Sequence, residues 1–289
     1  MIEVTLNIFS GRSNPQWTLI DAQENWFLEQ LAQITTTTMQ KPSGVLSRLG
    51  YRGFLVRRSP TSPGGSLNLW IQDQIVDYGQ SEPNRIADNR DLEDWLLVTA
   101  PKDLLSPKVI TAVTNELRQS PVDISSYLSA RAAAGSNCPQ CMSADAPAYQ
   151  PAMWNTPAVQ PYNNCYNYAN NQITNTFAQP GRANSVFPAN LDCADYQNAA
   201  TADGLVMAAG FANPLNTGEG SYVALVVWPG VDFHWYRQDD NGCWSHKPGQ
   251  TPVTNLDNAG NLIADPANCD LGSYGFCAYM ITNHNVVIA

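Results

Sequence analysis

Hydrophobic and polar side chains alternate along Glu3–Phe9, where Val4, Leu6 and Ile8 are apolar. This period of two is typical of a strand with one buried face. The next residues, 10–15, are rich in Ser, Gly, Asn and Pro, which favour a turn. Apolar positions in residues 21–34 then recur with the period of a helix, and Asp21 is the expected N-cap. The chain is therefore predicted to begin with a strand, a turn and a helix.

The same patterns continue to about residue 120. They predict strands over residues 51–57 and 67–78, and helices over 91–97 and 107–118. Mixed helices and strands of this length make a small α+β domain, placed at residues 1–130. It holds no recognisable chemical constellation, so a targeting or regulatory role is the interpretation of this part.

A segment rich in Ala, Pro, Ser and Gly, residues 131–161, has little periodicity and is interpreted as a linker. The aromatic and Asn-rich sequence that follows is predicted to form a second domain over residues 162–289, with helices near 165–176 and 194–209. Its apolar runs then predict a series of strands, at residues 222–228, 232–238, 243–247, near Leu262 and at 276–282. Both parts are thus expected to be α+β.

Charge separates the two parts and limits the partners. The 289 residues have a formal net charge of −10. Residues 1–131 hold twelve basic and fourteen acidic side chains, whereas residues 132–289 hold only Arg182, Arg237 and Lys247 against eleven acidic ones, and all seven cysteines. Nucleic-acid binding needs a basic surface, and no basic stripe is present. Nucleic acid is therefore excluded as an expected partner, while self-association stays open.

The expected location follows from apolar runs and cysteines. No run of about 18 apolar residues occurs, so no membrane span is expected. Residues 1–5 lack the basic and apolar regions of a secretory signal. Cysteine bridges would place the protein outside the cell or in a periplasm. A secreted or periplasmic location, by a route not visible at the N-terminus, is preferred over the cytoplasm.

Cys165 is the first candidate for chemistry. It follows the capping-type residues Asn163 and Asn164 at the predicted start of a helix. Unpaired N–H groups at a helix start favour a thiolate and also stabilise an oxyanion. Cys165 is therefore the candidate nucleophile, with its own N–H and the side-chain amide of Asn164 as candidate oxyanion donors.

Two of the three histidines are the candidates for its base. His234 lies in the predicted strand 232–238, and His246 follows twelve residues later across Asp239-Asp240-Asn241-Gly242. A three-residue loop with Gly242 in the left-handed position would set Tyr236 opposite His246 and turn both histidines to one face of the sheet. A two-residue loop would turn His246 to the other face. The third histidine, His284, is interpreted as a surface residue.

The order of a helix-start cysteine, a strand histidine and a later polar residue resembles the NlpC/P60 branch of the papain-like cysteine hydrolases, over residues 160–289. The resemblance implies a cysteine helix packed on an antiparallel sheet, and hydrolysis of a peptide, amide or ester bond, often in cell-wall peptide. It implies Cys165 as nucleophile, His234 as base and His246 as the residue that orients it. In the wider superfamily an Asn or Asp has that last role, which leaves Asn255 and Asp257 as alternatives.

The cysteine count offers a further hypothesis. Without Cys165 six cysteines remain, an even number that allows three disulfides in 15 arrangements. The Cys138-x-x-Cys141 spacing has a redox pair and half of a zinc site as alternatives. A disulfide or a pair of inert thiols is preferred, because no second such pair exists to complete a zinc site. No metal or cofactor is expected.

Two functions remain. The first is a cysteine hydrolase that acts on a peptide or cell-wall substrate, including an effector role. The alternative is a secreted, non-catalytic structural, self-assembling or carbohydrate-binding protein held by disulfides, which suits the low charge and the abundant Asn, Gln, Thr and aromatic residues. In that case Cys165 would be bridged and His234 would only pack.

Overall fold

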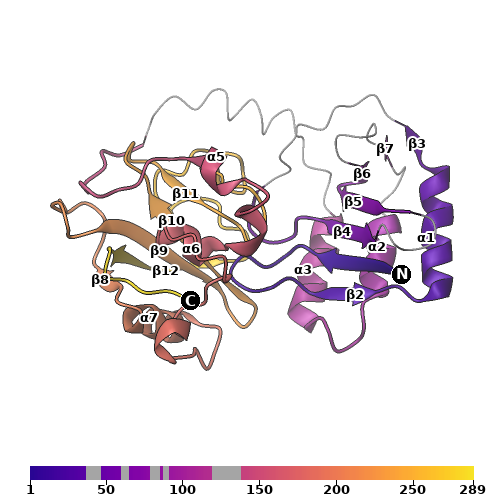
Figure 1. The fold of residues 1–289 in the computed structure, drawn as a ribbon, viewed down its shortest axis with the longest axis horizontal. Helices are drawn as coiled ribbons and strands as arrows, with labels where there is room; N and C mark the ends of the chain where they lie inside the picture. Colours follow the sequence, from indigo (N-terminus) through magenta and orange to yellow (C-terminus); the bar gives the residue numbers. More distant parts are fainter. Residues whose placement is uncertain (37–46, 60–64, 79–84, 87–90, 119–137) are drawn as a thin grey trace. The chain divides into compact units, whose positions relative to one another are not determined.

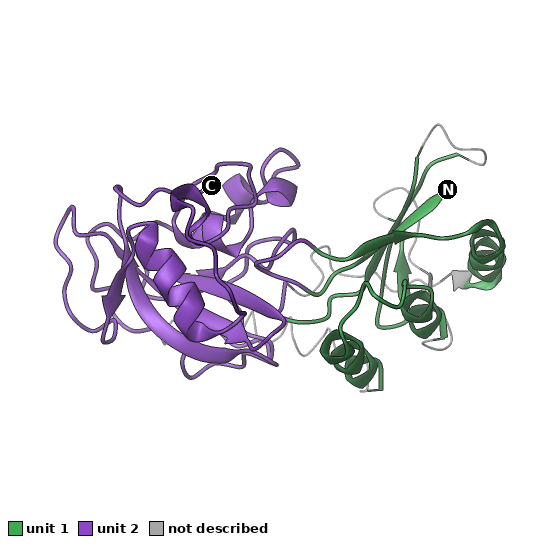
Figure 2. Ribbon diagram, turned by 90° about the horizontal axis from the view of Figure 1, so that it is seen from below, with its two compact units in different colours: residues 1–8, 14–46, 50–123 green, residues 9–13, 47–49, 124–289 purple. Residues whose placement is uncertain are grey.

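A computed structural model describes residues 1–36, 47–59, 65–78, 85–86, 91–118 and 138–289. The chain forms two compact units (Figure 2). Unit 1 comprises residues 1–8, 14–46 and 50–123. Unit 2 comprises residues 9–13, 47–49 and 124–289. The mixture of helices with antiparallel sheets confirms the predicted α+β class.

Within the described residues, unit 1 has a seven-stranded antiparallel sheet of order β2-β1-β4-β5-β6-β7-β3. Three helices gather on one side of it (Figure 2). The strands are β1 (Ile2–Leu6), β2 (Gln16–Thr18), β3 (Thr35–Thr36), β4 (Phe54–Arg58), β5 (Leu67–Gln72), β6 (Ile75–Asp77) and β7 (Arg85–Ile86), and the helices are α1 (Asp21–Gln33), α2 (Asp91–Val98) and α3 (Pro107–Arg118). The predicted strand 67–78 is a hairpin, because Asp73 and Gln74 adopt positive φ between β5 and β6.

Unit 2 has a five-stranded sheet in its described part, with the order β11-β10-β9-β12-β8 (Figure 1). Its strands are β8 (Val206–Ala208), β9 (Ser221–Trp228), β10 (Asp232–Gln238), β11 (Trp244–His246) and β12 (Gly275–Thr282), with the helices α5 (Pro151–Trp154), α6 (Cys165–Ala169) and α7 (Cys193–Ala202) and the 3-10 turns η2 (Gln160–Tyr162) and η3 (Arg182–Asn184). All neighbouring strands of this sheet run antiparallel.

The two helices predicted after residue 162 are shorter than expected. α6 ends at Ala169 because Asn171 takes a left-handed conformation, with φ of 53°. The N–H of Gln172 then bonds the carbonyl of Asn167 at 3.0 Å, and that of Asn171 bonds Tyr168 at 3.1 Å, which is a Schellman ending. α7 ends at Ala202, and the predicted helical residues 206–208 instead form β8.

The linker predicted at residues 131–161 is not supported where it is described. Residues 131–137 lie outside the described part of the chain. From residue 138 onward the segment belongs to unit 2: Cys138 is bridged to Cys243, and the Trp154 side chain is fully buried against Tyr168. A low-periodicity sequence can still be ordered when a disulfide and a large apolar side chain fix it.

The sheet of unit 2 separates two buried layers. One face carries Val223, Leu225, Phe233 and Trp235, and packs against α6, α7 and the C-terminal residues in an apolar core. The other face carries alternate residues of the same strands, among them His234, Tyr236 and His246. Residues 254–263 form bridges along the β11 side of the sheet, at Thr254 and Ile263. The alternation along β10 therefore decides which layer each candidate residue enters.

Candidate functional site

The start of α6 is fixed by Asn164. Its side-chain oxygen accepts the N–H groups of Tyr166 and Asn167 at 3.0 and 3.2 Å. The side chain of Asn167 in return accepts the N–H of Asn164, so the two residues form a reciprocal cap. The predicted helix start at Cys165 is therefore present, for the capping reason that the sequence suggests.

The oxyanion role predicted for Asn164 is not supported by this geometry. Its amide nitrogen donates to the carbonyls of Gly11 and Ala178 at 2.9 and 2.8 Å, and its oxygen serves the cap. The residue is fully buried. With both ends of the amide engaged in the fold, no donor remains for a substrate oxygen.

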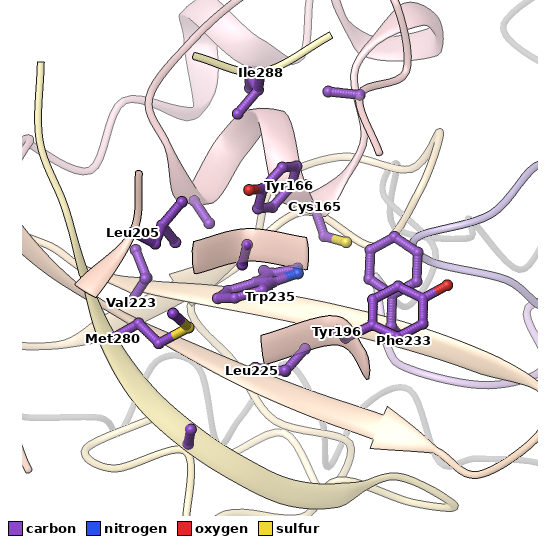
Figure 3. Close-up of a cluster of buried hydrophobic side chains, with 14 of the residues drawn as sticks. Cys165, Tyr166, Tyr196, Leu205, Val223, Leu225, Phe233, Trp235, Met280 and Ile288 are labelled. Carbon is purple, nitrogen blue, oxygen red and sulfur yellow. The ribbon is translucent and has the colours of Figure 1, made fainter. Parts of the chain in front are cut away.

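Cys165 lies inside the apolar core rather than in a cleft. Figure 3 shows its sulfur beside Phe233 and Trp235, with Tyr196 close by. Its exposed fraction is 0%. Desolvation by burial raises the pKa of the thiol, with a smaller contribution from the negative charge of Asp232, and both outweigh the hydrogen bond from the backbone of Trp235. A neutral, inaccessible thiol is a poor nucleophile.

His234 projects to the opposite face of the sheet from Cys165. Phe233 and Trp235, its two neighbours in β10, both belong to the core that contains Cys165. Successive side chains of a strand point to opposite faces, so His234 enters the other layer, where its ring meets Tyr236 and His246. The predicted nucleophile and base are therefore separated by the sheet, and the proton transfer assigned to them has no path.

The structure does bring the two histidines together. The loop of residues 240–242 has the three-residue form, with Gly242 at φ 83° and Tyr236 opposite His246, which confirms the predicted register. Nε2 of His234 lies 2.8 Å from Nδ1 of His246, and Nε2 of His246 lies 3.0 Å from the carbonyl of Leu256. A carbonyl only accepts, so His246 donates through Nε2; in its neutral form it then accepts from His234 through Nδ1.

Neither alternative orienting residue has that role. Asn255 bonds Ile263 through its backbone carbonyl. The buried carboxylate of Asp257 accepts the N–H groups of Asn261 and Asp270 at 2.8 and 3.1 Å and shapes the turn between them. The carbonyl of Leu256, between these two residues in sequence, is the group that fixes the ring of His246. A backbone group leaves no residue-type signal, so the sequence could not indicate it.

The cysteines form two disulfides, where the cysteine count allows three. Cys138 is bridged to Cys243 and Cys193 to Cys277. Cys141, Cys165 and Cys269 are not bridged. The Cys138-x-x-Cys141 spacing is therefore not an internal pair, and the expectation that Cys165 would be bridged in a structural protein is wrong. Two disulfides fit a secreted protein.

A buried carboxylate, missed by the sequence interpretation, organises one end of β10. Asp232 accepts the backbone N–H groups of Ser10, Gly11 and Arg12, the first at 2.5 Å, and the hydroxyl of Tyr274 at 2.6 Å. Desolvation raises its pKa to about 6, although these hydrogen bonds oppose the shift. The loop of residues 9–13 thus supplies an anion-binding nest that the protein fills with its own carboxylate.

Two of the three basic residues of the second part are also buried and fully used by the fold. Nζ of Lys247 donates to the carbonyls of Gln160, Asn163 and Gly249 at 2.6 Å each. Arg237 bonds Asp239 at 3.0 Å and packs over the ring of Tyr168 at 3.9 Å. These cations hold backbone segments in place and face no open cleft.

The described ranges contain neither a candidate metal cluster nor a helix that could span a membrane. No group of three or more His, Cys, Asp or Glu side chains there is arranged to hold a metal ion. None of the helices described there has the length and apolar character needed to cross a membrane.

Sequence comparison provides the remaining finding. No family model matches this sequence, and no solved structure matches it. Over 126 residues the chain is 47% identical to a protein of Ruditapes philippinarum described as "Insoluble matrix shell protein 1". The match covers 44% of this chain and 82% of that protein.

Proposed function

This chain belongs to the family of the insoluble matrix shell protein 1 of Ruditapes philippinarum, and from that premise we propose that it is a secreted, non-catalytic structural protein of an insoluble extracellular matrix. The observation that carries the proposal is the 47% identity, which extends over 82% of the relative. The partners proposed are other matrix proteins, including further copies of this chain.

The prediction of a cysteine peptidase, with peptide or cell-wall substrate and effector role, is corrected by the same finding, because the relative is named as a matrix component. The geometry agrees with the correction. Cys165 is buried, His234 points to the other face of the sheet, and the amide of Asn164 is consumed by the helix cap. These residues act in the fold, where they support its two buried layers.

The construction of unit 2 supports a durable extracellular role. Its bridges join residues 105 and 84 positions apart, so each closes a long loop. Loops of that length lose much conformational entropy when cross-linked in the unfolded chain, which favours the folded state by about 4–5 kcal/mol each in the chain-entropy model. The bridge between Cys193 and Cys277 joins α7 to β12. The bridge between Cys138 and Cys243 joins the segment before α5 to the hairpin of β10 and β11.

The test is fractionation of the extracellular matrix of the source organism. The matrix is extracted with dilute salt and chelator, then with detergent, then with detergent and reductant, and each fraction is probed with an antibody against unit 2. We expect the chain in the residue that salt and chelator leave behind. An abundant cytosolic enzyme serves as the control for contamination by broken cells. Recovery of the chain mainly with that enzyme, or in the dilute salt extract, would overturn the proposal.

A further inference from the structure

Two groups of charged side chains of opposite sign lie at the two ends of the sheet of unit 2. One further exposed carboxylate, Asp270 before the start of β12, belongs to neither group. β9 and β10 are antiparallel, with Asp232 opposite Trp228 at one end and Arg237 opposite Val223 at the other. Asp232 to Gln238 spans about 20 Å at the usual rise of a strand. A residue bonded to the start of β10 is therefore well separated from one that follows its end.

The end where β10 begins carries the exposed positive charge. The N–H of Arg12 bonds Asp232, and its guanidinium donates to the carbonyl of Val231 at 2.5 Å. Arg12 and Arg182 line one cavity of about 370 Å³ together with Ser13, Thr176, Phe177 and Gln179. No acidic side chain lines it. Because Arg237 and Lys247 are buried, Arg182 is the one exposed Lys or Arg of residues 138–289 in the structure.

The other end carries exposed carboxylates. Asp240 stands at the tip of the β10–β11 hairpin, and Glu219 lies two residues before β9 starts. Asp145 joins them, because its side chain accepts the N–H groups of Gly218 and Gly220. All three residues are exposed. Asp240 has its backbone fixed on the carbonyl of Pro147 at 3.0 Å, so the tip is held in place.

From this division we propose that the arginine cavity, defined by Arg12 and Arg182, binds the acidic end of a second copy of this chain, with the hairpin tip at Asp240 as the entering group. Guanidinium groups bind carboxylates through paired hydrogen bonds. The donor and acceptor surfaces lie at opposite ends of one unit. When two copies bind, one copy therefore keeps a free arginine cavity and the other keeps a free acidic end. Such a head-to-tail contact does not close and extends into a chain of copies.

The inference rests on the proposed structural function and supplies its mode of assembly. The first measurement is sedimentation velocity of the full oxidised chain over a range of concentrations, at about 0.02 M and about 0.5 M salt. We expect the mean mass to rise with concentration at low salt and to return to the monomer at high salt, because salt screens charge pairs at a surface. A wild-type chain that stays monomeric at low salt would overturn the proposal.

Charge reversal tests the two ends separately. Arg182→Glu and Asp240→Arg are each expected to weaken self-association about tenfold or more, the scale of close charge pairs at interfaces. An equal mixture of the two variants is expected to regain association, because each then offers the end that the other needs. Failure of the mixture to associate, with both variants folded by circular dichroism, would contradict a direct contact.

Matched controls are available in unit 1. Arg118→Glu and Asp103→Arg make the same changes in net charge at exposed positions of unit 1. They are expected to leave association unchanged. Equal weakening by these controls would show that net charge, and not a contact at the arginine cavity, governs self-association, which would contradict the proposal. A further arm adds heparin to the wild-type chain. Binding of heparin that depends on Arg182, in a chain that does not self-associate, would assign the cavity to an anionic polysaccharide and refute the proposal.

The outcome is independent of the matrix fractionation. A chain recovered from the insoluble matrix that nevertheless stays monomeric would keep the structural function and remove this mode of assembly. A chain that assembles head to tail but is recovered from the cytosol would do the reverse.

Discussion

Replacing Asp232 by Asn tests the account of the buried carboxylate that fixes residues 10–12. The substitution keeps the size of the side chain and removes its charge. The two short bonds, from Ser10 and Tyr274, both end on Oδ2. An Asn oxygen placed there retains them, and only the longer bonds to Oδ1, at 3.3 Å from Gly11 and Arg12, are lost. At pH 7 the loss of these bonds destabilises the variant, whereas removal of a buried charge stabilises it. The net change in the free energy of unfolding is therefore about 1 kcal/mol or less.

The pH dependence gives the larger and more specific effect. Burial raises the pKa of Asp232 from 3.8 to about 6 in the folded protein. Between these values the folded state binds more protons than the unfolded state, so the free energy of unfolding rises as the pH falls. For one such group the gain is about 1.3 kcal/mol from pH 7 to pH 5 and about 2.4 kcal/mol from pH 7 to pH 4. In Asp232→Asn this gain in the free energy of unfolding at low pH is expected to be absent.

The assay is urea unfolding at pH 7, 5 and 4, followed by tryptophan fluorescence. Both disulfides lie in unit 2, so the transition that moves when reductant is added identifies that unit. Burial also raises the pKa of Asp239 to about 6. Part of the pH dependence of the free energy of unfolding therefore remains in the variant. Asp270→Asn removes the same charge at an exposed site of unit 2 and serves as the control. Equal slopes for wild type and Asp232→Asn would refute the assigned burial cost.

Three further predictions concern the same unit. Cys165 is expected to resist iodoacetamide in the native oxidised chain at pH 7 and to react only after unfolding, because its side chain is fully buried; fast native labelling, mapped by mass spectrometry, would contradict its position. Replacing Cys138 and Cys243 by Ser should lower the free energy of unfolding by about 3–5 kcal/mol, measured by urea unfolding against wild type. Gly11→Ala should destabilise unit 2 by about 1–3 kcal/mol, because a Cβ there would lie 2.4 Å from the ring of Phe233; a thermal midpoint equal to that of wild type would show that the ring moves aside at no cost.

The hydrophobic pattern by itself determined the class of the fold. Alternation in β1, the apolar runs of β9 and β10, and the helical periods of α1 and α3 are local properties, and each produced the expected element. The Asp240-Asn241-Gly242 sequence also determined its hairpin loop, because only a glycine takes φ of 83° without strain. From that loop the contact between His234 and His246 followed correctly.

The candidate site depended on a choice that no local pattern makes, namely which face of β10 meets the cysteine helix. Both faces of β10 are buried, so its pattern of polar and apolar residues does not indicate which face packs against α6. The large apolar side chains Phe233 and Trp235 fill the layer under α6, and His234 is consequently turned away from Cys165. A histidine between two such aromatic residues could have suggested this outcome.

Long-range pairings were likewise decided only by the tertiary structure. The bridge between Cys138 and Cys243, the bonds of residues 10–12 to Asp232, and the carbonyl of Leu256 at His246 each join distant segments. Such contacts depend on how complete elements pack, and the energy of one contact is small beside the apolar burial that sets the packing. The sequence therefore determined which elements form, whereas packing of the two sheet faces decided that the cysteine and histidines support a structure instead of a reaction.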